Sequence, residues 1–211
     1  MAESQSPLWQ ALQDRDLAEM FRLLDSGADI NEQNDYGDSL LSEAIIDLAD
    51  HPCRRQIVEE MLRRGANPKI LDEEKCGPLL DTAIIKDATI MRMLLEAGAD
   101  PNREFGCAGT LTLYDWALSD YRYDEDLLNP PDEPTPQEEE TVDGWLSYIE
   151  RMALKYGKPL PDYVRVLREY GAKTGWELEE QAKRNGMPSP FQHETADLHP
   201  IQCGAAPDPK A

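Results

Sequence analysis

The sequence predicts an all-α solenoid of stacked helix-turn-helix units with hairpin-like loops, to which an insertion adds an extra helix. Three observations predict this fold class. A Gly-Ala pair recurs four times after segments with apolar residues at helical spacing. A short opening motif that ends in alanine recurs upstream of these pairs. The two motifs repeat in phase, with a period near 33 residues.

The Gly-Ala pairs mark where helices are expected to end. They stand at Gly27-Ala28, Gly65-Ala66, Gly98-Ala99 and Gly171-Ala172, and the first three lie 38 and 33 residues apart. Glycine suits the residue after a helix because this position often takes a positive φ, which is costly for a residue with a Cβ atom. Each pair therefore predicts the end of one helix.

The opening motif marks where a shorter helix is expected to begin. It occupies residues 6–11, 39–44, 78–83 and 112–117, and its aligned alanines, Ala11, Ala44, Ala83 and Ala117, are 33, 39 and 34 residues apart. In the first copy the hydroxyl of Ser6 can cap the free N–H groups of the first turn. Pro7 at the first helical position sacrifices no hydrogen bond.

Together the two motifs resemble those of the ankyrin-repeat family, whose units open with T-P-L-H-x-A and close with G-A-D-x-N. The nearest matches are residues 6–11, 27–31 and 98–102, and the resemblance covers about residues 2–120 and 162–175 in four units. The family's histidine is absent, since Trp9, Ser42, Asp81 and Asp115 stand at its position. The alternative is a generic helical bundle with coincidental Gly-Ala corners.

We expect one repeat domain over residues 1–184, with repeats at approximately 1–33, 34–71, 72–104 and 105–175, and a disordered tail over 185–211. The glycine-rich segment 105–109 is expected to form the hairpin before the fourth repeat. An insertion over residues 121–162 splits that repeat. Its acidic, proline-rich start is expected to hold no packed helix.

The insertion then becomes amphipathic over residues 142–156, with Trp145, Ile149, Met152 and Tyr156 on one stripe. This helix either packs on the last repeat, which we favour, or binds a partner. Residues 176–184 can close the stack as a further helical segment.

Composition limits the classes of ligand. Asp and Glu number 42 against 21 Lys and Arg, and the net charge of −21 disfavours nucleic acid and anionic lipid surfaces. The sequence shows no apolar run long enough to span a membrane and no signal peptide, which predicts a cytoplasmic protein. Four well-separated cysteines predict reduced thiols. The charge excess serves either solubility or steering toward a basic partner.

No pattern indicates catalysis, a cofactor or a metal. His51, His193 and His199 lack partners at zinc-ligand spacing, and the segment 105–109 lacks the lysine of a phosphate-binding loop. We therefore predict a protein without enzymatic activity or cofactor.

The resemblance implies that the loop tips and the outward positions of each first helix bind a partner protein. The predicted binding residues are Asp14, Asp35, Tyr36, Asp38, Asp47, Glu74, Lys75, Lys86, Asp120, Tyr121 and Tyr123. The carboxylates around Tyr36 are expected to receive Lys or Arg side chains, and the less favoured alternative is a solvated rim.

The expected function is a protein-protein interaction module that is monomeric when free and binds a partner with a basic surface. The alternative is a bacterial immunity or inhibitor protein that neutralises a basic toxin. A third possibility is a regulator whose insertion enters the cleft of a partner.

Overall fold

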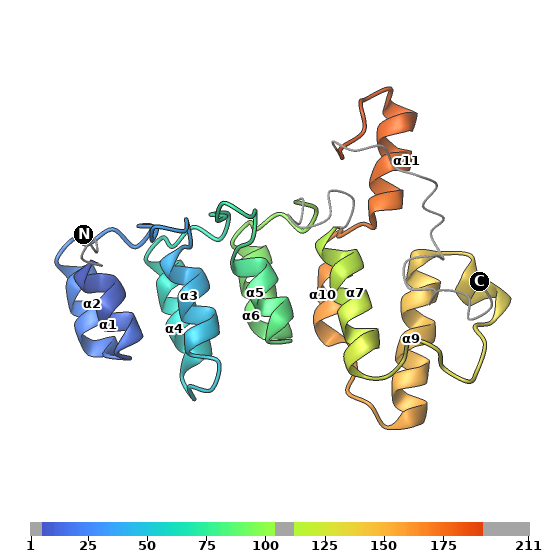
Figure 1. Ribbon diagram of the computed structural model, residues 1–211, viewed down its shortest axis with the longest axis horizontal. Helices are drawn as coiled ribbons and strands as arrows, with labels where there is room; N and C mark the ends of the chain where they lie inside the picture. The colour runs from blue at the N-terminus through green and yellow to red at the C-terminus, as the bar shows by residue number, and fades with distance from the viewer. Residues whose placement is uncertain (1–5, 104–111, 192–211) are drawn as a thin grey trace. The chain divides into compact units, whose positions relative to one another are not determined.

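The computed structural model describes residues 6–103 and 112–191, and these residues are all-α (Figure 1). The chain divides into two compact units, residues 1–100 (unit 1) and 101–211 (unit 2). The single domain predicted over residues 1–184 stays a prediction. The segment 105–109 lies outside the described residues, as does most of the predicted tail.

Unit 1 consists of three helix pairs. Its helices are α1 (Pro7–Gln13), α2 (Leu17–Asp25), α3 (Leu40–Asp47), α4 (Arg54–Arg63), α5 (Pro78–Ile84) and α6 (Ala88–Glu96). The first helices α1, α3 and α5 pack side by side, and the second helices α4 and α6 also pack on each other. This is the stacked arrangement that the two sequence motifs predict.

The helix ends follow the local chemistry of the sequence. The Ser6 side chain accepts a hydrogen bond from the N–H of Trp9, and Pro7 occupies the first turn of α1. Gly27, Gly65 and Gly98 follow α2, α4 and α6 with φ of 96°, 95° and 95°. The predicted role of glycine at these helix ends is confirmed.

The core of unit 1 comes from the inward stripes of these helices. Its fully buried side chains include Leu12, Met20, Leu40, Ala44, Ile45, Val58, Met61, Ala83, Ile90 and Met91. Burial of one such aliphatic side chain contributes roughly 1.5–3 kcal/mol. The loop between α3 and α4 is longer than the other connections inside a pair because Pro52 interrupts the helical pattern.

Unit 2 contains a helix pair that is split in sequence. Its helices are α7 (Leu113–Asp124), α8 (Pro136–Glu139), α9 (Val142–Tyr156), α10 (Asp162–Glu169) and α11 (Gly175–Asn185), and α7 packs against α10.

The split pair shares with the regular repeats a pair of hydrogen bonds made by one asparagine side chain, which we call the asparagine clamp. In unit 1 the amide of Asn31 donates to the carbonyl of Gly65 and accepts from the N–H of Asn67. In unit 2 the amide of Asn102 donates to the carbonyl of Gly171 and accepts from the N–H of Lys173. The segment after α10 therefore takes the same place as the segment after α4.

Two details of the insertion differ from the sequence prediction. Helix α7 continues to Asp124, past the expected start of the insertion at residue 121. The proline-rich start is not free of helix, because Thr135 and Glu138 form a capping box around α8 and Pro136 occupies its first turn. Proline is compatible with a first turn, and the Thr-x-x-Glu pattern supplies the caps.

Helix α9 packs within unit 2. Ile149 and Met152 are fully buried, and α8 lies against α9 at Gly144, where a Cβ atom would stand 2.7 Å from the carbonyl oxygen of Glu138. The burial of Ile149 and Met152 agrees with packing, the favoured of the two predicted roles, whereas Tyr156 of the predicted stripe is 40% exposed.

Helix α11 covers residues 176–184, where a further helical segment was predicted, and its closing of the stack stays a prediction. The guanidinium of Arg168 on α10 hydrogen bonds to Glu177 on α11 at 2.7 and 2.8 Å and to Asp143 on α9 at 2.7 Å. The side chain of Arg168 is 19% exposed. One arginine therefore joins three helices of unit 2.

Candidate surface for partner binding

Two loops of unit 1 end in turns of the same design. In the first, the side-chain oxygen of Asn34 accepts from the N–H groups of Tyr36 and Asp38. In the second, Asp72 accepts in the same way from the N–H groups of Glu74 and Cys76. Asx side chains stabilise turns by capping backbone N–H groups two residues on, so both loop tips have a fixed conformation.

The tip of the first loop presents predicted binding residues to solvent. Asp35 is exposed and the side chain of Tyr36 is 76% exposed, whereas Asp38 is half-buried and accepts from the side-chain amide of Asn34 at 2.8 Å. Gly37 has φ 83°, and a Cβ atom there would lie 3.2 Å from the Cα atom of Asp72. The two loop tips are therefore in close contact.

The second tip carries Glu74 and Lys75, both exposed. Lys75 occupies the position of Gly37 and has φ 63°, a left-handed conformation that costs a non-glycine residue energy. Lys86, in the turn between α5 and α6, has φ 55°.

Five carboxylates of the loops and first helices form an acidic group, namely those of Asp38, Glu43, Asp47, Asp72 and Asp81. Burial raises the pKa of Glu43 on α3 to about 7, and the charges of Asp47 and Asp38 add to the shift. Burial likewise raises the pKa of Asp81 on α5 to about 7, helped by Asp38, Asp72 and Glu43, although a hydrogen bond from Ser42 opposes the shift. Atom Oδ2 of Asp81 is buried and meets no hydrogen-bond donor among the described residues. A cation placed here would relieve the repulsion.

Asp38 and Asp47 of this group are among the binding residues predicted from the sequence, whereas Glu43, Asp72 and Asp81 are not. Two signals could have found them. Glu43 and Asp47 are four residues apart on one helix, so they share a face. Asp81 and Ser42 hold the same position in consecutive opening motifs, which stacking brings together.

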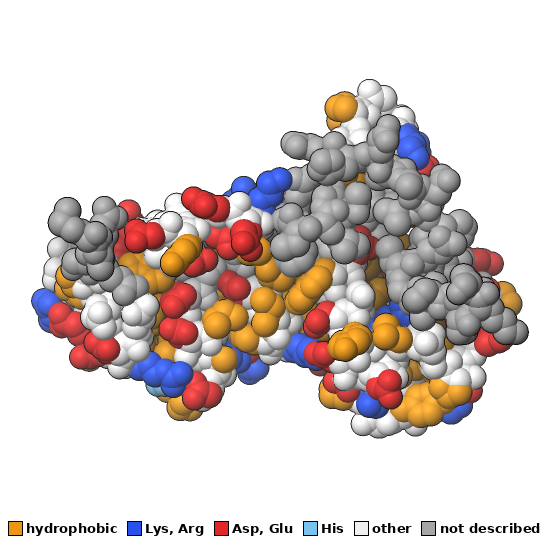
Figure 2. Space-filling view, viewed as in Figure 1, with side chains coloured by type: hydrophobic (Ala, Val, Ile, Leu, Met, Phe, Trp, Pro, Cys, Tyr) orange, Lys and Arg blue, Asp and Glu red, His pale blue; other side chains and the backbone are white. Residues whose placement is uncertain are grey.

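Exposed apolar side chains accompany the acidic group. Ile46 on α3 is 37% exposed and Ile84 on α5 is 50% exposed. Figure 2 shows acidic side chains beside hydrophobic ones over α3, α5 and the loops above them. We call this surface the acidic face; it consists of Asp35, Tyr36, Asp38, Glu43, Ile46, Asp47, Asp72, Glu74, Asp81 and Ile84.

The remaining predicted binding residues lie in different surroundings. Asp14 is exposed in the turn after α1. In unit 2, Asp120 is half-buried and Tyr123 is 72% exposed. Tyr121 is only 1% exposed, and its hydroxyl donates to the carbonyl of Pro159 at 2.5 Å. Tyr121 is therefore a packing residue, because the continuation of α7 turns it inward.

The described part of the chain lacks the features of a metal site, a membrane span or a disulfide. No group of three or more His, Cys, Asp or Glu side chains there is arranged to hold a metal ion. None of the described helices is long and apolar enough to cross a membrane. Cys53 and Cys76, the cysteines within the described ranges, form no disulfide.

The chain is similar to two known proteins that contain ankyrin repeats. No protein-family profile matches the chain. The chain is 31% identical over 113 residues, or 54% of its length, to the "Ankyrin repeat domain-containing protein SAT10" of Stachybotrys chartarum, of whose length it spans only 6%. The crystal structure of the human ASB11 ankyrin repeat domain superposes with a TM-score of 0.47 and 19% identity, covering 80% of this chain and 85% of the other.

Three lines of observation coincide in this chain. Its helix pairs stack with a period near 33 residues, a left-handed glycine ends the second helix of each pair, and Asn31 and Asn102 make the same clamp. The identity with a protein named for its ankyrin repeats agrees with these features. The chain is an ankyrin-repeat protein.

Proposed function

We propose that the chain is a non-enzymatic binding module whose acidic face binds a partner protein with a basic surface. Ankyrin repeats generally mediate protein-protein interaction, and the concave side of stacked repeats is the usual binding side. The observation that supports a basic partner is the gathering of acidic side chains beside the exposed Tyr36, Ile46 and Ile84 over α3, α5 and the loops (Figure 2).

The free energy for capture would come from charge and apolar contact together. A Lys or Arg side chain that approaches Glu43 and Asp81 would favour their ionised forms and recover part of the cost of their burial. Tyr36, Ile46 and Ile84 add apolar area next to the charges. An aromatic side chain near the centre of an interface often contributes 2 kcal/mol or more, on the order seen for hot spots.

Charge also bears on the rate of association. The net charge of −21 attracts a basic partner over a distance set by the ionic strength. Electrostatic steering raises association rates roughly 10- to 1,000-fold at low salt. We therefore expect binding to weaken steeply as salt rises.

The test is affinity capture from the native cell followed by quantification of each bound protein. The double variant Asp35→Lys and Asp47→Lys should lose the partner, because it reverses two charges of the acidic face. The matched control is Glu59→Lys and Glu96→Lys, which makes the same change of net charge on exposed positions of α4 and α6. The control should keep the partner.

Equal loss in both double variants would show that net charge alone governs capture and would refute a specific face. Retention in both would place binding elsewhere. If the captured partner is an enzyme that loses its activity when bound one to one, the protein is an inhibitor. An active partner would make it an adaptor.

A further inference from the structure

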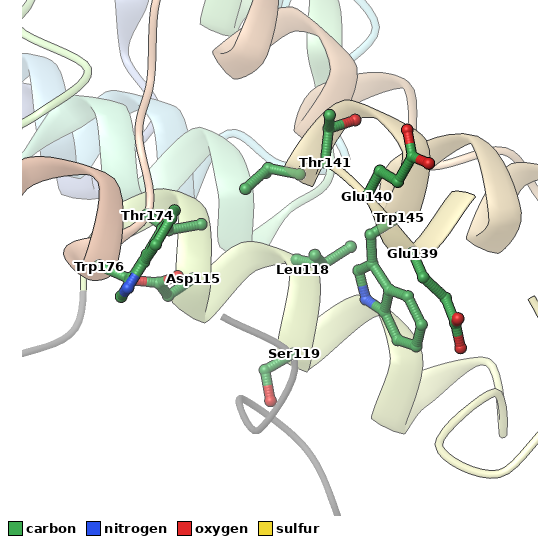
Figure 3. A pocket seen from close by; sticks show the side chains of 10 residues that line it. Asp115, Leu118, Ser119, Glu139, Glu140, Thr141, Trp145, Thr174 and Trp176 are labelled. Carbon is green, nitrogen blue, oxygen red and sulfur yellow. The ribbon is translucent and has the colours of Figure 1, made fainter. Parts of the chain in front are cut away.

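Unit 2 contains a pocket that the insertion creates. It lies between α7, the corner that joins α8 to α9, and the start of α11 (Figure 3). Its volume is about 100 Å³. A water molecule needs only about 10–15 Å³ of such space, so the pocket can hold a group of several atoms.

The pocket combines aromatic rings with carboxylates. Trp145 on α9 and Trp176 on α11 line it together with Leu118 on α7, and Figure 3 shows Leu118 between the two tryptophans. Glu139 and Glu140 line it from the corner before α9, although Figure 3 shows their carboxylate groups directed away from Leu118. No Lys or Arg is among the described lining residues. The indole of Trp176 is partly open to solvent, with 39% of the residue exposed.

The lining is held in place before any ligand arrives. Asp115, which also lines the pocket, accepts from the N–H groups of Thr112 and Gly175 at 3.2 and 2.8 Å. The ring of Trp145 lies 5.0 Å from that of Tyr148, and the guanidinium of Arg122 lies 5.4 Å from the centre of Trp145. A rigid site loses little conformational freedom on binding.

We infer that this pocket binds the cationic side chain of a lysine or arginine presented by a basic protein. The face of an indole attracts a cation through its quadrupole, and Trp is the most effective ring for this interaction. The negative charges of Asp115, Glu139 and Glu140 around the pocket disfavour an anion and favour a positive head group. Leu118 and Val142 offer apolar contact to the aliphatic stem of the side chain.

Arg122 lies against the ring of Trp145 but is not among the residues that line the pocket. Its side chain is buried and donates to the carbonyl of Leu128 at 2.8 Å. The three acidic residues of the lining, Asp115, Glu139 and Glu140, outnumber this one positive charge. The pocket therefore keeps a negative character.

The inference rests on the proposed function only in naming a basic protein as the source of the cation. The pocket is composed of unit 2 residues, and the acidic face is composed of unit 1 residues. A small probe tests the pocket without any partner protein, and capture through Asp35 and Asp47 tests the acidic face. Failure of either one leaves the other standing.

The test is a titration of the ¹⁵N-labelled full chain with Nα-acetyl-lysine methylamide and with Nα-acetyl-arginine methylamide. Its readout is the indole N–H resonances of the four tryptophans in the chain. Both probes should shift the signals of Trp145 and Trp176 with about millimolar affinity. Trp9, which is buried in unit 1, should not respond.

The norleucine analogue separates charge from apolar contact, because it keeps the alkyl stem and lacks the ammonium group. It should bind at least about fivefold more weakly than the lysine probe. An equal response would overturn the inference by showing a purely apolar pocket. The absence of any shift at Trp145 and Trp176 would overturn it as well.

Two substitutions test the residues themselves. Glu140→Gln should weaken the lysine probe about threefold, whereas Glu133→Gln, an exposed carboxylate outside the lining, should leave its affinity unchanged. Trp176→Leu should remove most binding. It should leave the chain folded, because Trp176 is partly exposed. If Glu140→Gln and Glu133→Gln bind alike, the lining carboxylates play no part and the inference fails.

Discussion

Replacement of Asp81 by Asn should stabilise unit 1 at high pH and leave its stability unchanged at low pH. In the folded chain, burial raises the pKa of Asp81 from an ordinary 3.8 to about 7. Between these two values the folded state holds a proton that the unfolded state has lost. The free energy of unfolding therefore decreases as pH rises from about 4 to about 7. Asparagine keeps the shape, accepts from Ser42 and carries no charge.

The size of the change in unfolding free energy follows from the pKa shift of Asp81. About three pKa units at roughly 1.36 kcal/mol each set an upper limit near 4 kcal/mol. The repulsion is shared with Glu43, which also takes up a proton, and solvent screens part of it. We expect Asp81→Asn to raise the free energy of unfolding by about 1–3 kcal/mol at pH 8 and by less than about 0.5 kcal/mol at pH 4.

The assay is urea unfolding at several pH values, followed through the indole signal of Trp9, which is 2% exposed in unit 1. Asp35→Asn is the control, because it neutralises an exposed carboxylate of the same face and should change stability by no more than about 0.5 kcal/mol. Equal stabilisation by Asp81→Asn at pH 4 and pH 8 would refute a charge effect. A stability of the parent chain that increases from pH 5 to pH 8 in proportion to the charge at Asp81 would contradict the sign of the argument.

Three further substitutions test the turns and helix α11. Gly37→Ala should destabilise unit 1 by about 1–2 kcal/mol in the same urea assay, since φ is 83° and the new Cβ atom would crowd the backbone of Asp72; an unchanged midpoint would refute this account of the turn. Lys75→Gly should instead stabilise it by up to about 1 kcal/mol, because Lys75 has φ 63°, and a clear destabilisation would show that its side chain matters more than its backbone. Arg168→Met should cost unit 2 about 2–3 kcal/mol and speed hydrogen exchange in α11, because it leaves Glu177 without its arginine; unchanged exchange in α11 would rule out the proposed tie between the helices.

Local sequence signals determine the repeats of this protein, which is why they could be predicted. A glycine at a helix end and a Ser-Pro helix start depend on neighbouring residues alone, so Gly27, Gly65, Ser6 and Pro7 were identified without a structure. The amphipathic stripe of α9 is equally local, and its packing followed from the cost of exposing Ile149 and Met152.

The features that escaped prediction depend on residues far apart in sequence. Tyr121 faces inward on the continued α7, and its hydroxyl bonds to Pro159, 38 residues later, which no local pattern reveals. Asp81 belongs to the acidic group because stacking brings α5 beside α3 and its Ser42. The short helix α8 was missed for another reason: the prolines of the segment were counted as breakers, although Pro136 stands where a helix tolerates proline.

The most direct test of the proposed binding face is hydrogen exchange of the chain alone and in complex with its captured partner. The proposal predicts slower exchange in the complex over residues 34–38 and 72–76 and along α3 and α5, with little change in α4 and α6. Protection confined to α4 and α6, or absent from unit 1 altogether, would contradict it.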